Sequence, residues 1–305
     1  MKAIRFHEYG DINVLRYEDT PTPGPGPGEV LVAVAATAFN PVDTWFRAGI
    51  VDQIFPVSFP HTLGLDLAGT VVDRGPGVED PAIGAAVIGF LPMTGPGAAA
   101  EYVAAPADVL VLAPATIPLI DAAAIPVPTL TAWQALFEHG NLVTGQRVLV
   151  NGAGGGVGGF VVQLAKQAGA IVIATASARS ADAVRAAGAD HIIDYTASTI
   201  ADALDAPVDL AINLVPGTGD DTAALLEVVA PEGTLVSITP PGGEFPRVVF
   251  FSVRSDTTQL THIVELIDHG QLHLDITARR PLAHTAQLHQ QSEDGALRGR
   301  TLLIP

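Results

Sequence analysis

One stretch of the chain joins a strand-like run to a cluster of glycines. Residues 147–151 are mostly aliphatic, residues 152–159 are rich in glycine, and residues 160–166 have helical spacing. Glycine lets the backbone turn tightly, and the helix that follows presents free N–H groups and a positive dipole end to an anion. The stretch predicts the phosphate-binding turn of a dinucleotide-binding βαβ unit. The alternative is a turn kept only for close packing of helix against sheet.

The glycines fit this fingerprint in two registers. The literal one uses Gly154, Gly156 and Gly159. The other starts from Ala153 and begins the helix one residue earlier.

The residues after the second strand indicate which dinucleotide binds. Units that bind NAD usually carry Asp or Glu at the end of that strand, for the ribose 2′-hydroxyl. Here residues 170–176 run into Ser177 and Arg179, and no carboxylate appears before Asp182. A hydroxyl and a guanidinium suit a 2′-phosphate, so the sequence predicts NADPH. The alternative is that Arg179 is a solvated residue at a helix start.

Two kinds of element pattern must position these residues. The N-terminal third has short strands expected at 1–6, 29–36, 67–72 and 85–90, and a connector rich in Pro and Gly at 20–28. This pattern predicts a small, β-rich, barrel-like domain.

From about residue 121 helices and strands alternate, which predicts an α/β fold with a doubly wound parallel sheet. Asp121 is expected to cap a helix over 122–124, and a turn is expected at 231–233. A last helix and a strand at 301–304 are expected to rejoin the first domain. The other expected helices cover 131–138, 157–168, 180–187, 198–204 and 220–229, and the expected strands cover 147–151, 170–176, 190–193, 208–214 and 234–238.

The length of 305 residues is enough for two domains. We expect a substrate domain from residues 1–120 and 271–305, and a dinucleotide-binding domain from residues 121–270.

Composition excludes several classes of protein. With 48% hydrophobic and 15% charged residues, the chain is expected to be compact and globular. A net charge of −17 and only two lysines argue against binding to nucleic acid or to an anionic membrane. No apolar run reaches the roughly 18 residues of a membrane helix, and no signal-peptide pattern begins the chain, so we expect a cytoplasmic protein.

Cysteine is absent, which excludes disulfides, thiol nucleophiles and every zinc site built on thiolate. We expect all nine histidines to be surface residues or hydrogen-bonded core residues.

Motifs spread over nearly the whole chain are more specific than the glycine turn alone. They are FNPVDTWFRAG at 39–49, FPHTLGLDLAG at 59–69, TLTAW at 129–133 and GADHIIDY at 188–195. Together they resemble the zinc-free quinone oxidoreductase, or zeta-crystallin-like, branch of the medium-chain dehydrogenase/reductase superfamily. The resemblance implies a GroES-like substrate domain, a Rossmann domain, NADPH and a homodimer. It also favours the register of Ala153, Gly155 and Gly158.

The resemblance implies a site without metal. Zinc-dependent relatives have a cysteine where this chain has Asn40, and a His-Glu pair where it has Leu65 and Asp66. Leucine cannot ligate zinc, so the resemblance excludes a catalytic zinc.

The same resemblance assigns candidate site residues. Asn40 would be a carboxamide near the substrate, Asp43 would organise its loop or cap a turn, and Thr131 would contact the nicotinamide or start a helix. Trp45 stands where the branch often has tyrosine, so an indole replaces a phenolic donor. The catalytic candidates are Asn40, Asp43, Trp45 and Thr131.

Strand ends of the parallel sheet and the family motifs supply the cofactor-binding candidates, because such sheets bind ligands at the carboxyl ends of their strands. For the candidates after residue 212, the alternative is that they are ordinary buried residues at strand ends. Arg298 and Arg300 are candidates for a further phosphate contact, or else for a surface turn. The cofactor-binding candidates are Thr131, Ala153, Gly154, Gly155, Gly156, Val157, Gly158, Ser177, Arg179, Tyr195, Asn213, Leu214, Val215, Ile238, Phe250, Phe251 and Val253.

The expected reaction is direct hydride transfer from NADPH to a quinone. Two alternatives stay open: an NADPH-dependent alkenal or enoyl reductase, which shares the hydride geometry, and a non-catalytic NADPH-binding or sensing protein.

Overall fold

The computed structural model describes residues 1–305, which form two compact units. Unit 1 comprises Met1–Val127 and Ser255–Pro305, and unit 2 comprises Pro128–Arg254. The domain limits expected from the sequence lie between residues 120 and 121 and between residues 270 and 271, and they remain a prediction. Packing places residues 121–127 and 255–270 in unit 1.

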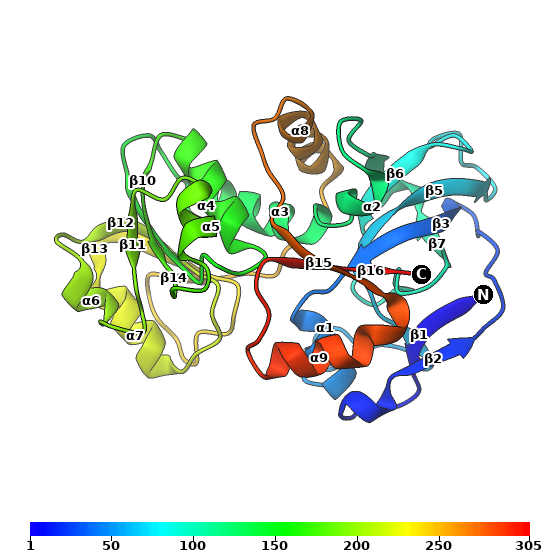
Figure 1. Cartoon of the computed structure of the whole chain (residues 1–305), viewed down its shortest axis with the longest axis horizontal. Helices are drawn as coiled ribbons and strands as arrows, with labels where there is room; N and C mark the ends of the chain where they lie inside the picture. The colour runs from blue at the N-terminus through cyan, green and yellow to red at the C-terminus, as the bar shows by residue number, and fades with distance from the viewer. The chain divides into compact units, whose positions relative to one another are not determined.

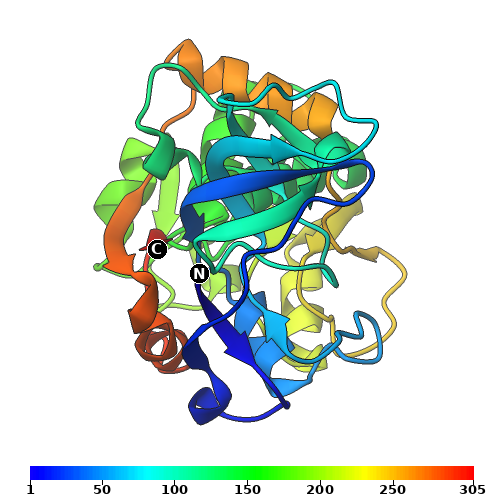
Figure 2. The same cartoon turned by 90° about the vertical axis from the view of Figure 1, so that its right-hand side faces the viewer.

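Unit 1 consists mainly of antiparallel strands (Figures 1 and 2). Its strands are β1 (Lys2–Phe6), β2 (Arg16–Asp19), β3 (Glu29–Ala38), β4 (His61–Thr62), β5 (Asp66–Arg74), β6 (Ala86–Phe90), β7 (Tyr102–Pro106), β8 (Leu110–Leu112), β15 (Ile276–Pro281) and β16 (Arg300–Ile304). Its helices are η1 (Ile12–Val14), α1 (Val42–Ala48), η2 (Ala107–Val109), α2 (Leu119–Ala122), α8 (Thr257–Asp268), η4 (Leu282–His284) and α9 (Thr285–Glu293).

The main sheet of unit 1 has the order β15-β16-β3-β5-β6-β8, and β7 also pairs with β3. Alternate residues of β3, including Val30 and Val32, point into a core shared with Leu67 and Val87, as the period-2 pattern of a half-buried strand requires. The C-terminal strand β16 pairs antiparallel with β3. This pairing brings residue 300 next to the end of β3 and the loop that follows it.

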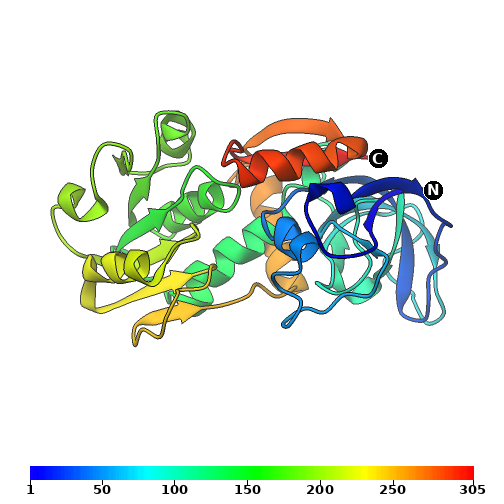
Figure 3. The same ribbon diagram turned by 90° about the horizontal axis from the view of Figure 1, so that it is seen from below.

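The last helix of unit 1, α9, lies beside α1 and the N-terminal segment (Figure 3). Arg47 of α1 forms an ion pair with Glu293 of α9, with a nitrogen–oxygen distance of 2.6 Å. The two ends of the sequence therefore build one unit.

Unit 2 is a six-stranded parallel sheet in the order β11-β10-β9-β12-β13-β14. Its strands are β9 (Arg147–Asn151), β10 (Ile171–Thr175), β11 (His191–Ile193), β12 (Val208–Asn213), β13 (Val229–Ser237) and β14 (Val248–Phe250). Its helices are α3 (Pro126–Trp133), which begins at the last residues of unit 1, the π-helix η3 (Gln134–His139), α4 (Gly158–Gln167), α5 (Ala181–Ala186), α6 (Ile200–Ala203) and α7 (Gly219–Glu227).

The strand order of unit 2 reverses between β9 and β12, which are neighbours although three helices and two strands separate them in sequence. Helix α4 packs on β9 and β10, and α7 packs on β13 (Figure 1). The carboxyl ends of β9 and β12, at Asn151 and Asn213, therefore form the switch point where open α/β sheets bind ligands.

The predicted fold class is confirmed: a β-rich unit accompanies a doubly wound parallel sheet. Three local predictions are wrong. Asp121 does not cap a helix, because α2 begins at Leu119 and Asp121 lies inside it. The helix expected from Thr131 begins at Pro126, since proline fits the first turn of a helix. Residues 231–233 form no separate turn but an irregularity within β13.

No helix of the chain combines the length and the apolar composition needed to cross a bilayer.

Candidate active site

The glycine turn of unit 2 joins β9 to α4. Gly152 has a φ of +92°, which favours glycine. A Cβ atom on Gly158 would lie 2.5 Å from the backbone of Ala153, whereas one on Gly159 would meet nothing within 4 Å. Since the close helix–turn contact is at Gly158, the geometry favours the register of Ala153, Gly155 and Gly158.

The turn suits the pyrophosphate of a dinucleotide. Helix α4 begins without a side-chain cap, and its first backbone bonds are donated by Phe160 and Val161 to the carbonyl of Val157. Apart from the Gly155 amide, which donates to the Gly152 carbonyl, the turn amides just before Phe160 are therefore left for another acceptor. A Cβ atom on Gly154 would lie 2.4 Å from the Ser180 hydroxyl, so a side chain there would crowd the start of the next helix.

Three predicted residues lie at the carboxyl edge of two neighbouring parallel strands. Ser177 and Arg179 follow β10, and Tyr195 follows β11. Ser177 is half-buried and Arg179 is exposed, and 55% of Tyr195 is exposed. Asp194, the carboxylate nearest in sequence to Tyr195, accepts hydrogen bonds from the amide and hydroxyl of Thr196, which lower its pKa.

Hydrogen bonds connect the carboxyl ends of four strands of unit 2. The Thr175 hydroxyl donates to Asn151 Oδ1 at 3.0 Å, and Asn151 Nδ2 donates to Asn213 Oδ1 at 2.9 Å. Asn213 Nδ2 lies 3.3 Å from Ser237 Oγ and 3.4 Å from Thr239 Oγ1. We call these five residues the strand-end network.

The strand-end network reaches the glycine turn directly. The amide of Gly152 donates to Thr175 Oγ1 at 2.9 Å. The amide of Val215 donates to Asn213 Oδ1, and a Cβ atom on Gly152 would lie 2.7 Å from Val215 Cγ2. The loop after β12 and the glycine turn are thus packed together and share hydrogen-bonded partners.

The remaining cofactor candidates of unit 2 differ in exposure. Thr131 is buried in α3, and Phe251 is buried with its ring 4.3 Å from the His139 ring. Phe250 ends the edge strand β14 and is exposed. The half-buried candidates are Leu214, Ile238 and Val253.

In unit 1, Asn40 belongs to a fully buried group of charged and polar side chains. Asn40 Oδ1 accepts from Arg300 Nη1 at 2.9 Å, and Asn40 Nδ2 donates to Asp66 Oδ2 at 2.9 Å. Arg300 Nη2 donates to the same Asp66 oxygen at 2.6 Å, and the Val127 amide donates to the other at 2.7 Å. Exposure is 4% for Asn40, 0% for Asp66 and 3% for Arg300. We call these three residues the charged triad.

The charged triad corrects the prediction for Arg300. Its side chain is committed to Asp66, Asn40 and the carbonyl of Phe39, so the sequence-based phosphate contact is wrong for this residue. Arg298 is paired with Asp275 at 2.8 Å.

Asp43 is hydrogen-bonded to the loop that carries Asn40, a contact that is compatible with both of its predicted roles. Asp43 lies in the first turn of α1, and its Oδ2 accepts a hydrogen bond from the backbone amide of Asn40 at 2.8 Å. The pKa of the Asp43 carboxyl is raised to about 7, chiefly by burial and also by the negative charge of Asp66, although the backbone amide of Asn40 and the charge of Arg300 oppose the rise. Trp45 is half-buried on the same helix.

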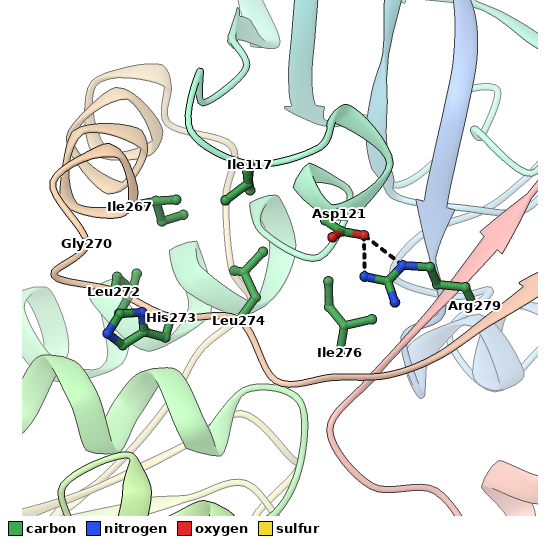
Figure 4. A pocket seen from close by; sticks show the side chains of 9 residues that line it. All are labelled: Ile117, Asp121, Ile267, Gly270, Leu272, His273, Leu274, Ile276 and Arg279. Atoms are coloured by element: carbon green, nitrogen blue, oxygen red, sulfur yellow. Dashed lines mark hydrogen bonds and ion pairs between the residues drawn. The ribbon is translucent and has the colours of Figure 1, made fainter.

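Arg279 and Asp121 form another pair of opposite charges in unit 1, at the pocket drawn in Figure 4. Arg279 of β15 donates through Nε and Nη2 to Asp121 Oδ1 at 2.8 and 2.6 Å, at one end of a depression of about 460 Å³. Its other walls include Ile117, Ile267 and Leu272. Arg279 is 46% exposed and Asp121 is 16% exposed, so water shields this pair far more than the charged triad.

Comparison with known proteins identifies the families that this chain resembles. Residues 26–115 match the alcohol dehydrogenase GroES-like domain, and residues 187–303 match the zinc-binding dehydrogenase family. The chain is 31% identical to the chloroplast envelope quinone oxidoreductase homolog of Arabidopsis thaliana, over 100% of this chain and 98% of the relative. It is 32% identical to the NADPH-dependent alkenal/one oxidoreductase of that organism, over 100% and 80%.

Among solved structures, the quinone oxidoreductase of Escherichia coli in complex with NADPH matches all of this chain and all of its own. The TM-score is 0.91 and the identity is 26%. The chain belongs to the quinone oxidoreductase branch of the medium-chain dehydrogenase/reductase superfamily. Unit 1 is accordingly its GroES-like domain and unit 2 its Rossmann domain.

At the positions where zinc-dependent members of the superfamily carry ligands, this oxidoreductase has a different donor set. Leu65 is buried, and Asn40 and Asp66 are already bonded to Arg300. No three His, Cys, Asp or Glu side chains among residues 1–305 converge on a common point. The GroES-like domain therefore offers a carboxamide and a paired carboxylate at these positions.

The histidine prediction needs one correction. His289 is fully buried in α9, yet neither ring nitrogen has a hydrogen-bond partner within the chain. Burial, together with the positive charge of Arg47, lowers the pKa of His289 to about 3. His289 packs against Phe39 with ring centroids 5.2 Å apart, so it behaves as an aromatic core residue rather than a hydrogen-bonded one.

Sequence reasoning did not find which residues pair with one another in the charged triad or in the strand-end network. Asp66 and Arg300 are 234 residues apart in sequence, and nothing local joins them. The strand-end network did leave a signal: Asn151 and Asn213 are polar last residues that follow the aliphatic runs 148–150 and 210–212.

Proposed function

We propose that the protein is an NADPH-dependent quinone oxidoreductase that transfers a hydride without a metal. Its membership of the quinone oxidoreductase branch carries the proposal, and the E. coli relative was solved with NADPH. The glycine turn and the uncapped start of α4 fit the pyrophosphate.

The choice of NADPH over NADH rests on the end of β10. The stretch 176–181 contains no carboxylate, and it includes Ser177 and Arg179 after the strand end at which NAD-binding units usually carry an acidic residue, with Tyr195 at the neighbouring strand end. Arg179→Ala is expected to raise the dissociation constant of NADPH far more than that of NADH. Equal effects on the two cofactors would contradict the assignment.

When bound, NADPH supplies the hydride. A quinone can accept it because the incoming charge delocalises onto an oxygen. The side-chain carboxamide of Asn40 is the candidate hydrogen-bond donor at that oxygen. Trp45 offers an apolar wall to a flat acceptor, and Thr131 is the candidate contact for the nicotinamide. The remaining cofactor candidates at the strand ends would hold and orient the dinucleotide.

A second candidate function is reduction of an alkenal or enone, and the similarity to an alkenal/one oxidoreductase favours it. The deciding experiment is a stopped-flow measurement of NADPH oxidation with 1,4-benzoquinone and with a 2-alkenal. Faster turnover with the quinone supports the proposal, and faster turnover with the alkenal supports the second candidate. Tight NADPH binding without oxidation by either would instead indicate a non-catalytic NADPH-binding protein.

Two further expectations accompany the proposal. A homodimer is expected through the sheet of unit 2, whose edge strand β14 ends in the exposed Phe250, and light scattering tests it. A cytoplasmic location also stays a prediction, since relatives include chloroplast and mitochondrial proteins.

A further inference from the structure

The charged triad constrains the Asn40 carboxamide in a way that the proposed function does not require. A carboxamide can normally flip, which exchanges its oxygen and its nitrogen. A flipped Asn40 would direct its NH₂ group at the Arg300 guanidinium and its oxygen at the Asp66 carboxylate. Both new contacts would be repulsive, and burial of all three side chains leaves this repulsion poorly screened, so only one orientation is stable.

The orientation decides which atoms of Asn40 are left over. Its oxygen is occupied by Arg300, and one amide hydrogen is occupied by Asp66. The second amide hydrogen has only a long contact, 3.4 Å, to the Ala38 carbonyl. The carboxamide therefore keeps a weakly engaged N–H donor, which suits an acceptor oxygen that gains negative charge, whereas its oxygen already binds a cation.

The guanidinium also changes the strength of that donor. A charge-assisted bond to Oδ1 pulls electron density toward the oxygen and leaves the amide hydrogens more positive. Since guanidinium groups are not deprotonated in proteins, this polarisation does not depend on pH.

We propose that Asp66 and Arg300 are positioning residues that lock and polarise the Asn40 carboxamide, so that it presents an N–H group and not its oxygen to the acceptor. The proposal rests on the proposed function for its catalytic consequence. It goes beyond it by assigning roles to two residues that do not touch substrate.

The competing explanation is that the ion pair only ties β16 to β5. Removing one partner would leave a buried charge and could unfold the protein, so the informative variant removes both charges together: Asp66→Asn with Arg300→Met. The matched control is Asp121→Asn with Arg279→Met, which removes the half-exposed pair of the same unit.

If the proposal holds, the Asp66→Asn/Arg300→Met enzyme loses roughly 10- to 100-fold in kcat, because one oriented donor is weakened rather than deleted. Its NADPH dissociation constant, measured by fluorescence titration, stays within twofold of the original, since unit 2 is unchanged. Arg300→Lys keeps the charge but lacks the forked guanidinium group that can bind two partners at once. Its kcat is therefore expected to lie between that of the original enzyme and that of the double variant. The control pair leaves kcat unchanged. Unchanged kcat in the folded double variant would overturn the proposal.

A second measurement does not depend on turnover. In ¹H–¹⁵N spectra the Asn40 side-chain NH₂ is expected as two sharp, slowly exchanging signals, and as broadened or rapidly exchanging signals in the double variant. Identical signals in both would overturn the positioning role. If the unaltered protein oxidises no NADPH with any acceptor, the proposed function fails while this measurement still decides whether the triad locks Asn40.

Discussion

The two units bury polar side chains in opposite ways. The charged triad of unit 1 pairs the Asp66 carboxyl with the Arg300 guanidinium, with at most 4% exposure. The strand-end network of unit 2 uses only amides and hydroxyls, although it is also largely buried and spans four strands. The two groups of side chains thus have different electrostatic consequences.

The difference indicates what each unit must do. A neutral network adds no charge beside a turn proposed to hold phosphates, so it can fix the turn without repelling them. A charged triad polarises its neighbour strongly, but depends on both charges being present. Unit 1 should therefore be sensitive to loss of a charge, and unit 2 to the gain of one.

Arg300→Met is expected to have the largest effect. It leaves the Asp66 carboxylate buried and unpaired, which should lower the free energy of unfolding by about 3–5 kcal/mol. Adding Asp66→Asn should restore most of the loss, since no uncompensated charge remains. Arg279→Met, in the half-exposed pair, should cost less than about 1 kcal/mol. Urea titration measures all three, and equal losses for Arg300→Met and Arg279→Met would erase the contrast between the pairs.

The buried carboxyl of Asp43 should make the stability of unit 1 depend on pH. Because burial raises its pKa from 3.8 to about 7, the folded state holds a proton that the unfolded state releases. Its contribution to stability is therefore full below about pH 4 and falls by about 1.4 kcal/mol per pH unit up to about pH 7.

The variant Asp43→Asn should remove that slope. The difference in unfolding free energy between variant and original, followed from pH 4 to pH 8, should rise with pH and level off above pH 7. Subtraction cancels the opposite slopes of His61 and His289, whose lowered pKa values make acid destabilising. A flat difference curve would mean that Asp43 is ionised throughout.

The sequence predicted unit 2 better than unit 1 because its signals are local. The strand, the glycine turn and the start of α4 are contiguous, and each element has its own periodicity or capping pattern, such as the Thr218–Asp221 capping box of α7. The irregular β13 was misread since Pro231 and Gly233 are typical turn residues, yet pairing with β12 extends the strand through them.

The charged triad was out of reach of sequence reasoning for a physical reason. Asn40 and Asp66 lay in recognised motifs, but their partner Arg300 is placed by the antiparallel pairing of β16 with β3. An arginine near a chain end is normally a solvated residue, and only the tertiary fold desolvates it. His289 was misjudged likewise, because its burial depends on α9 packing against α1.

Asn213→Asp adds a charge to the strand-end network and so reverses the contrast. The carboxyl loses the donors that reach Val215, Ser237 and Thr239, and should lower the free energy of unfolding by about 1–3 kcal/mol at pH 8. Burial should raise its pKa, so the loss should shrink as pH falls and the group is protonated. NADPH should also bind more weakly at pH 8 than at pH 6, as fluorescence titration can show. An equal loss at both pH values would indicate a purely steric effect.

The smallest expected effect concerns the one buried group of unit 1 whose ring nitrogens find no partner. His289→Phe keeps the ring against Phe39 and removes two unsatisfied nitrogens, so the free energy of unfolding should rise by about 1 kcal/mol at pH 7. The gain should grow below pH 6.5, because the original folded state must keep His289 neutral while the unfolded state is protonated. His284→Phe, an exposed position at the start of the same helix, is the control and should show neither change. A loss of stability in His289→Phe would mean that a bound water satisfies the imidazole, and that this buried ring of unit 1 is hydrogen-bonded after all.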